Sequence, residues 1–248
     1  MEVGFKTDKG KMRSNNEDAC FVMKNDNVFI VADGVGGNQS GEIASRTAVT
    51  CIAEYIEKHT LRGIKTREKI KKYFTTCMDE ANNRIMRSSV RFEQNRGMAT
   101  TIVVGYIDKD KLYVFNIGDS RAYILRNSDL IQITEDHTYV NSLVKAGVIT
   151  EEEARFHAKR NMITKAIGAE PNIIPDMFVE SLKKGDFILF CTDGLYGELS
   201  KDEIIDIIHN NNDMVHVCEE LTDQANHNGG SDNITIICIR ITEDDVNE

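Results

Sequence analysis

The sequence predicts an α+β protein in which antiparallel β-sheets are covered by helices. One observation is a succession of apolar runs within 101–133, whose connections are too short for the crossover that parallel strands need. Another is a pair of long helical patterns, at 40–58 and 66–90, each of which keeps one face apolar. The chain therefore combines antiparallel sheets with long covering helices.

Strands are predicted where Val, Ile, Phe and Tyr gather between Gly, Asp or Asn residues. These runs lie at 19–23, 28–32, 100–107, 111–117, 121–126, 186–191 and 233–241. Thr66 is a suitable N-cap for the second long helix. Two further helices begin with the spacing of a capping box, Thr150 with Glu153 and Ser200 with Glu203. A last amphipathic helix is predicted from about 213 to 226.

Length and composition fit one globular domain better than two, with 248 residues of which 41% are hydrophobic and 28% charged. No linker or repeat interrupts the pattern, so we predict a single domain over 1–241 followed by an acidic tail over 242–248. The formal net charge of -10 argues against a protein that binds the phosphate backbone of nucleic acid.

No apolar run approaches the roughly 20 residues of a membrane span, and the first residues lack the pattern of a signal peptide. The six cysteines are scattered and form no CxxC pair. They are interpreted as reduced, buried thiols rather than as a disulfide framework or a zinc site. The sequence thus predicts a cytoplasmic protein that does not associate with a membrane.

Four aspartates stand at the ends of predicted strands. Asp33, Asp119 and Asp193 each come shortly after an apolar run, whereas Asp232 comes just before one. In an antiparallel sheet the end of one strand lies beside the start of its neighbour, so four such carboxylates can gather at one edge. A single Asp-Gly pair is more typical of a turn. The recurrence favours a shared site.

Clustered carboxylates repel one another in a partly buried site, and positive charge must offset that repulsion. Divalent cations do so best. Oxygen ligands without an adjacent His or Cys fit Mg²⁺ or Mn²⁺ rather than zinc. The glycines after Asp33 and Asp193 let the backbone come close enough for a carbonyl to join the ligands. The sequence therefore predicts a site for more than one metal ion.

Six segments of the chain resemble the signature segments of the metal-dependent protein serine/threonine phosphatases, the PPM or type 2C family. They match in order and at similar spacing over about residues 1–241, and the match is closest to the compact bacterial members. The segments are "GKMRSNNEDA", "VADGVGG", "NIGDSRAY", "MITKAIG", "LFCTDGLY" and "GGSDNITI".

The resemblance implies a four-layer α-β-β-α sandwich with two central antiparallel β-sheets and a binuclear metal centre at one end. By this resemblance, Asp33 bridges the two metals and the carbonyl of Gly34 supplies a further ligand. Asp193 and Asp232 complete the protein ligands of the first metal. The implied cofactors are Mn²⁺ or Mg²⁺, as two tight ions and a third, weaker one.

The resemblance also implies the remaining roles in the site. Glu17 and Asp18 hold metal-bound waters, and Asp119 binds the third ion together with Asp193. Arg13 grips the substrate phosphate, a role that suits the bidentate and permanently charged guanidinium. The reaction implied is direct attack on phosphorus by a hydroxide that bridges the two metals, without a phosphoenzyme.

Several residues keep a second interpretation. Arg121 is expected to be structural, pairing with an acid near the site. His137 is more typical of a hydrogen-bonding loop residue than of an acid–base catalyst. Residues 137–165 correspond to the family's variable flap, in which Lys159 and Arg160 either steer a phosphopeptide or form a solvated face.

One position departs from the family pattern. Some members carry a histidine soon after the bridging Asp-Gly, where it is proposed as the general acid. This chain has Asn38 in that neighbourhood, and asparagine has no proton of useful pKa to donate. We therefore expect a metal-bound water to protonate the leaving group instead.

The leading hypothesis is a phosphoprotein phosphatase that acts on phosphoserine and phosphothreonine. Its expected partners are phosphorylated proteins, including a serine/threonine kinase and its substrates, and the protein is expected to be a monomer. One alternative is a two-metal enzyme for nucleotide or nucleic acid phosphodiesters, against which the acidic charge counts. The other is a non-catalytic phosphoprotein-binding relative, against which the intact set of site residues counts.

Overall fold

The computed structural model describes residues 1–37 and 40–245. Two antiparallel sheets form its centre. The first has the strand order β1 (Glu2–Asp8), β11 (Ile234–Arg240), β10 (Phe187–Cys191), β7 (Arg121–Arg126) and β8 (Asp129–Gln132). The second has the order β2 (Asp18–Met23), β3 (Val28–Val35), β5 (Ile102–Asp108), β6 (Lys111–Ile117) and β9 (Asp176–Ser181), and the short β4 (Ala99–Thr100) also pairs with β3.

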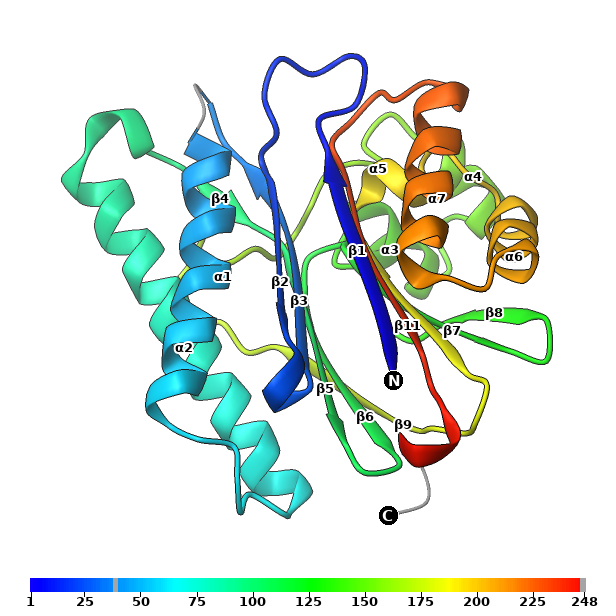
Figure 1. Ribbon diagram of the computed structural model, residues 1–248. Helices are drawn as coiled ribbons and strands as arrows, with labels where there is room; N and C mark the ends of the chain where they lie inside the picture. The colour runs from blue at the N-terminus through cyan, green and yellow to red at the C-terminus, as the bar shows by residue number, and fades with distance from the viewer. Residues whose placement is uncertain (38–39, 246–248) are drawn as a thin grey trace.

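Helices cover the outer face of each sheet, as Figure 1 shows. The long pair α1 (Ser40–Lys58) and α2 (Arg67–Arg91) lies on the β2–β3 sheet, and α6 (Lys201–Asn210) and α7 (Met214–Asn228) lie beside the β1–β11 sheet. The short helices α3 (Tyr139–Lys145), α4 (Glu151–Phe156) and α5 (Asp193–Tyr196) lie near one end. The predicted four-layer α-β-β-α sandwich is confirmed.

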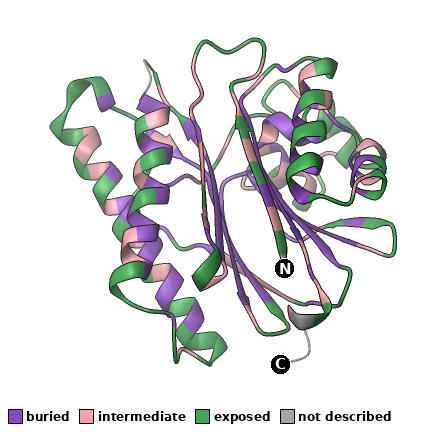
Figure 2. Ribbon diagram, in the orientation of Figure 1, coloured by how far each residue is buried: buried purple, intermediate pink, exposed green. Residues whose placement is uncertain are grey.

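Buried apolar side chains fill all three interfaces between the four layers. Figure 2 shows the buried residues in purple. Phe74 and Phe115 stack under α2, and Leu189 packs with Leu221 under α7. Between the sheets, the ring of Phe190 lies so close to Gly105 that a Cβ there would collide with it. Because Gly105 has no side chain, the two sheets can approach this closely.

The helix starts follow the sequence rules. In α4 the backbone N–H of Thr150 donates to Glu153 Oε2 at 2.7 Å, and the N–H of Glu153 donates to Thr150 Oγ1 at 3.2 Å. Ser200 and Glu203 make the same reciprocal pair at the start of α6. Thr66 accepts the N–H of Lys69. All three predicted caps are confirmed, and each cap side chain accepts one of the N–H groups that lack a partner within the helix.

The strands β1 and β9 lie at sheet edges, and the sequence pattern did not predict them. Edge strands are half exposed, so their apolar residues alternate with charged ones and the runs look too polar. Beyond β11, Thr242 donates its backbone N–H to Asp245 Oδ2 at 2.7 Å, so this part of the predicted acidic tail is folded. The division into a domain over 1–241 and a tail stays a prediction.

All six cysteines are free thiols and five are buried, as predicted. Within residues 1–37 and 40–245, no helix is both long enough and apolar enough to cross a lipid bilayer.

Candidate active site

The carboxylates gather where β2 begins and β3 ends. Asp18 and Asp33 are direct partners in the β2–β3 register, which places their Cβ atoms about 5 Å apart. Two threonines fix the β3 end: Thr101 Oγ1 accepts the N–H of Asp33 at 3.0 Å, and Thr100 Oγ1 donates to the Asp33 carbonyl at 2.8 Å. The backbone at Asp33 is therefore held in place independently of its carboxylate.

The other sheet brings two more carboxylates to this end. Asp193 begins α5, directly after β10, and Asp232 stands just before β11, the antiparallel neighbour of β10. Gly194 packs so tightly here that a Cβ would collide with the carbonyl of Asn233. The Asp-Gly pair at 193–194 is therefore required by the close approach of two chain segments rather than by a hairpin turn.

Burial and mutual repulsion raise the pKa values of these carboxyls. The pKa of Asp18 rises to about 8 through burial, against hydrogen bonds from Thr235 and Thr192 that lower it. Burial likewise raises the pKa of Asp193 to about 6, with the charge of Asp232 adding to the shift. For Asp33, burial and then the charges of its carboxylate neighbours hold the pKa well above the ordinary range. The four carboxylates predicted to converge, those of Asp33, Asp119, Asp193 and Asp232, therefore share one electrostatic environment with Asp18.

Asp119 joins this cluster from the turn between β6 and β7. It is buried, and burial followed by the charge of Asp193 raises its pKa to about 7. Its carbonyl accepts the hydroxyl of Tyr196 at 2.9 Å. Asp119 thus lies at the border of the cluster nearest to α5.

Glu17 and Gly34 are adjacent in space. The N–H of Gly34 donates to the Glu17 carbonyl at 3.1 Å, and a Cβ on Gly34 would collide with the carbonyls of Gly41 and Glu17. Burial raises the pKa of Glu17, with the nearby Glu42 and Asp232 adding to the shift and Arg13 opposing it. The requirement for glycine at 34 therefore comes from backbone packing, which brings the Gly34 main chain into the carboxylate site.

Arg13 lies over the cluster and is half exposed. Its Nη2 donates to Asp232 Oδ2 at 2.7 Å. The guanidinium is thus the cation closest to Asp232 in the described part of the chain, and it reaches the site from a surface loop. Solvent has access to the rest of its donor fork.

Sequence reasoning missed two residues that assemble the site. Thr192 donates its hydroxyl to Asp18 Oδ2 at 2.8 Å, which ties β10 to β2. Asn233 accepts the N–H of Glu17 at 2.7 Å and donates to the carbonyls of Lys9 and Asn15, both at 2.8 Å. Both residues flank predicted ligands in the quoted segments, and that adjacency is the signal that could have identified them.

The structure shows the contacts of Arg121 and His137, the two residues near the site for which a structural role was expected. Arg121 is structural, as expected: it makes a fork to Asp136 and stacks 3.5 Å from the ring centre of Tyr196. His137 is a hydrogen-bonding loop residue, since its Nδ1 accepts the N–H of Gly118 at 2.9 Å. Asn38 lies outside the described residues, so the departure at this position stays a sequence argument.

The flap is built from α3 and α4, and a β-bridge between Thr138 and Ile163 closes its base. Lys159 lies in this segment with its Nζ 5.1 Å from the ring centre of Tyr139, and Arg160 is exposed beside it. The choice between steering and a solvated face is open for both residues.

An all-oxygen site of this kind fits hard divalent cations. Two buried carboxylate oxygens, Asp18 Oδ1 and Asp193 Oδ1, have no hydrogen-bond partner among the described residues, and a buried carboxylate left this way is costly unless a cation approaches it. Within residues 1–37 and 40–245, no three His, Cys, Asp or Glu side chains already stand in a metal-ligand arrangement.

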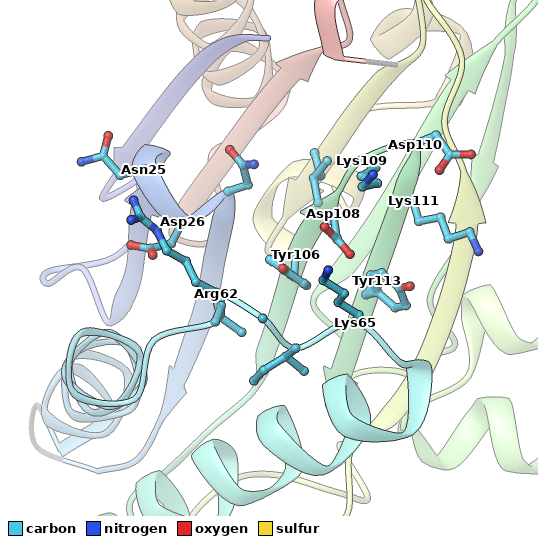
Figure 3. A pocket seen from close by; sticks show the side chains of 15 residues that line it. Asn25, Asp26, Arg62, Lys65, Tyr106, Asp108, Lys109, Asp110, Lys111 and Tyr113 are labelled. Atoms are coloured by element: carbon cyan, nitrogen blue, oxygen red, sulfur yellow. The ribbon is translucent and has the colours of Figure 1, made fainter. Parts of the chain in front are cut away.

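A separate hollow of about 480 Å³ lies at the opposite end of the same strands (Figure 3). It is bounded by the β2–β3 and β5–β6 turns and by the connection between α1 and α2. Its labelled side chains include Lys65, Asp108 and Tyr113, and none of the site carboxylates lines it. This hollow is not part of the candidate active site.

Fold and site together define a two-sheet α+β sandwich with a carboxylate cluster at one end of its sheets. The sequence model of the family Protein phosphatase 2C matches residues 11–235. The chain therefore belongs to the protein phosphatase 2C family, and the prediction of an enzyme of the serine/threonine phosphatase class is confirmed. The chain is 34% identical over 242 residues to the serine/threonine phosphatase stp of Listeria welshimeri, covering 96% of this chain and 95% of that protein.

Solved structures agree with the family assignment. The S. agalactiae serine/threonine phosphatase superposes with a TM-score of 0.89 at 34% identity, covering 97% of this chain and 99% of that one. The catalytic domain of the serine/threonine protein phosphatase PstP, solved in complex with two manganese ions, superposes with a TM-score of 0.85 at 28% identity and covers 98% of both chains. The fold of these serine/threonine phosphatases is thus shared along nearly the whole chain.

Proposed function

We propose that this protein hydrolyses phosphoserine and phosphothreonine in proteins by direct attack of hydroxide on phosphorus, with divalent cations held by its carboxylate cluster. The observation that carries the proposal is the convergence of Asp18, Asp33, Asp193 and Asp232 from both sheets onto one electrostatic site. Charges of one sign are gathered there at a cost that Arg13 offsets at Asp232 and that bound divalent cations would offset for the whole cluster.

Bound Mn²⁺ or Mg²⁺ would supply Lewis acidity, lowering the pKa of water and neutralising charge that develops on the phosphoryl oxygens. Asp33, Asp193, Asp232 and the carbonyl of Gly34 are the proposed direct ligands. Glu17 and Asp18 are proposed to orient water, and Thr192 keeps the Asp18 carboxylate turned to the site through its 2.8 Å bond. The third, weaker ion is proposed to bind at Asp119 together with Asp193.

Arg13 is proposed to bind the substrate phosphate. Its guanidinium is half exposed beside Asp232, and among residues 1–37 and 40–245 only one of its donors, on Nη2, has a hydrogen-bond partner. Because arginine matches two phosphate oxygens at once, it can orient a phosphomonoester for in-line displacement. A phosphodiester has one charge fewer on the group that the arginine and the cations would bind, so the monoester is the favoured substrate.

The cellular setting follows from the chemistry of the chain. The free, buried cysteines suit a reducing compartment, so we propose a cytoplasmic enzyme. A phosphoserine and phosphothreonine phosphatase opposes a serine/threonine kinase, and the kinase and its substrates are therefore the proposed partners. We propose that the catalytic unit is a monomer, because all the residues assigned to the site come from one chain.

The test is release of phosphate from a phosphothreonine peptide as Mn²⁺ is added to EDTA-treated protein. Hydrolysis should depend on Mn²⁺ and stop with excess EDTA. A bis-phosphodiester and a phosphotyrosine peptide serve as controls and should be much poorer substrates. Preference for the diester would favour the nucleic acid alternative, and binding of phosphopeptide without any hydrolysis would favour the non-catalytic one.

A further inference from the structure

His137 and Gly118 hold each other through two hydrogen bonds. The backbone N–H of Gly118 donates to His137 Nδ1 at 2.9 Å, and the backbone N–H of His137 donates to the Gly118 carbonyl at 3.0 Å. Asn116 Nδ2 reaches the same carbonyl at 3.2 Å. Both polar groups of the Gly118 peptide backbone are therefore held by side chains or backbone from outside its own turn.

Gly118 directly precedes Asp119, and its backbone has little freedom to place that residue otherwise. Its φ of +105° lies in the region that favours glycine. A Cβ at this position would also collide with Thr101, whose hydroxyl contacts Ser120 Oγ at 2.6 Å. The Asp119 carboxylate is thus carried on a short turn fixed by Thr101 on one side and by His137 on the other.

The hydrogen bonds assign the protonation of the imidazole. Because Nδ1 accepts an amide N–H, it carries no proton, and the neutral ring must carry its proton on Nε2. Nε2 lies 3.3 Å from Asp176 Oδ2, and Lys165 Nζ lies 3.2 Å from the other oxygen of the same carboxylate. Burial and the charge of Lys165 lower the pKa of His137, which agrees with a neutral ring.

His137 also stands at the base of the flap. Its carbonyl accepts the N–H of Thr164 at 2.8 Å, and the next residues are bridged to the returning strand by the N–H of Tyr139 donating to Met162. One residue therefore connects the flap base, the β9 carboxylate of Asp176 and the turn that carries Asp119.

We propose that His137 is a positioning residue: through its Nδ1 acceptor it holds the Gly118–Asp119 turn and so keeps the Asp119 carboxylate placed to bind the weaker divalent cation. This inference rests on the proposed role of Asp119. His137 has no contact with substrate in this account and acts only through the turn.

Two substitutions separate the acceptor from the bulk of the ring. In His137→Asn the side-chain oxygen takes the place of Nδ1 and keeps the bond to Gly118. His137→Leu keeps a similar volume without an acceptor. His216→Leu, at an exposed position on α7, is the matched control for removing an imidazole.

The first measurement is amide hydrogen exchange at Gly118 in EDTA-treated protein, which needs neither metal nor activity. One neutral hydrogen bond contributes about 1 kcal/mol, so exchange at Gly118 should accelerate about fivefold in His137→Leu. It should stay near the wild-type rate in His137→Asn and His216→Leu. Unchanged exchange in His137→Leu would overturn the proposed clamp.

The second measurement is the Mn²⁺ concentration for half-maximal phosphopeptide hydrolysis, with calorimetry of the tight ions. His137→Leu should raise that concentration about fivefold while KM and the tight ions stay unchanged, and His137→Asn should restore it. Equal damage from Asn and Leu would overturn the inference. Should His137→Leu fail to fold, His137→Gln replaces it, since glutamine reaches past Nδ1 and leaves Gly118 without its acceptor.

The two measurements keep this inference distinguishable from the role of Asp119. If Asp119→Ala leaves the Mn²⁺ requirement unchanged, the role of Asp119 fails whatever happens at Gly118, and the ion-binding half of the inference is overturned with it. If Asp119→Ala raises the requirement and His137→Leu does not, only the positioning role of His137 is overturned.

Discussion

Asp18→Asn should stabilise the metal-free protein at alkaline pH and flatten the dependence of its stability on pH. In the wild type, Asp18 accepts the Thr192 hydroxyl through Oδ2, and its buried Oδ1 has no hydrogen-bond partner in the part of the chain that the structure describes. An asparagine keeps an oxygen for Thr192 and turns an N–H₂ toward the neighbouring carboxylates. The substitution removes one buried negative charge without removing atoms, so no cavity forms.

The magnitude follows from the raised pKa. The pKa of Asp18 is about 8 in the folded protein, against about 3.9 in an unfolded chain. Between these values the folded state binds the proton and the unfolded state does not, so stability is lost as pH rises toward the folded pKa. Relative to the high-pH limit, where Asp18 is ionised in both states, proton binding by folded Asp18 adds about 4 kcal/mol to the free energy of unfolding at pH 5. At pH 8 it adds less than about 1 kcal/mol.

Urea denaturation followed by circular dichroism, in EDTA at pH 5 to 8, measures this effect. The wild-type free energy of unfolding should fall across the range, and Asp119 and Asp193 add to the fall because their pKa values are also raised. Asp18→Asn should fall less, by about 4 kcal/mol at most. Asp110→Asn, at an exposed turn between β5 and β6, is the control and should follow the wild type. Equal slopes for Asp18→Asn and wild type would refute the reasoning.

Three further outcomes are expected from single substitutions in the site. Asp193→Asn should abolish Mn²⁺-dependent hydrolysis yet keep the fold, which turnover with Mn²⁺ and thermal unfolding in EDTA will check; near wild-type turnover would remove Asp193 from the site. Arg13→Ala should raise KM for a phosphopeptide more than it lowers kcat, because the guanidinium binds ground and transition states alike; an unchanged KM argues against phosphate binding. Asp119→Ala should bind two Mn²⁺ ions normally in calorimetry and lose most phosphopeptide turnover; loss of the tight ions would instead place Asp119 in the core of the metal site.

Local rules accounted for much of the fold. The capping boxes of Thr150 and Ser200 and the long helices α1 and α2 were predictable, because caps and periodic apolar faces are properties of neighbouring residues. The strands β1 and β9 were not, since an edge strand gains its stability from one partner far away in sequence and needs no continuous apolar run.

In the candidate site, too, some residues could be predicted from the sequence and others could not. The aspartates at strand ends were found because antiparallel strands bring such ends together, and the structure places Asp193 after β10 and Asp232 before its antiparallel neighbour β11. The ties made by Thr192 and Asn233 were not found, because each depends on a partner more than a hundred residues away. The partner of His137 was not found either: Gly118 is only 19 residues away, but their hydrogen bond depends on how the flap base returns to the turn after β6.

The central claim is that the carboxylate cluster holds the divalent cations on which phosphate hydrolysis depends. Its most direct test is a calorimetric titration of Mn²⁺ into EDTA-treated, dialysed wild type and Asp33→Asn, with phosphothreonine peptide hydrolysis measured on the same samples. The account predicts two tight ions and hydrolysis in the wild type, and in Asp33→Asn fewer tight ions together with loss of hydrolysis. Two tight ions and near wild-type turnover in Asp33→Asn would contradict it.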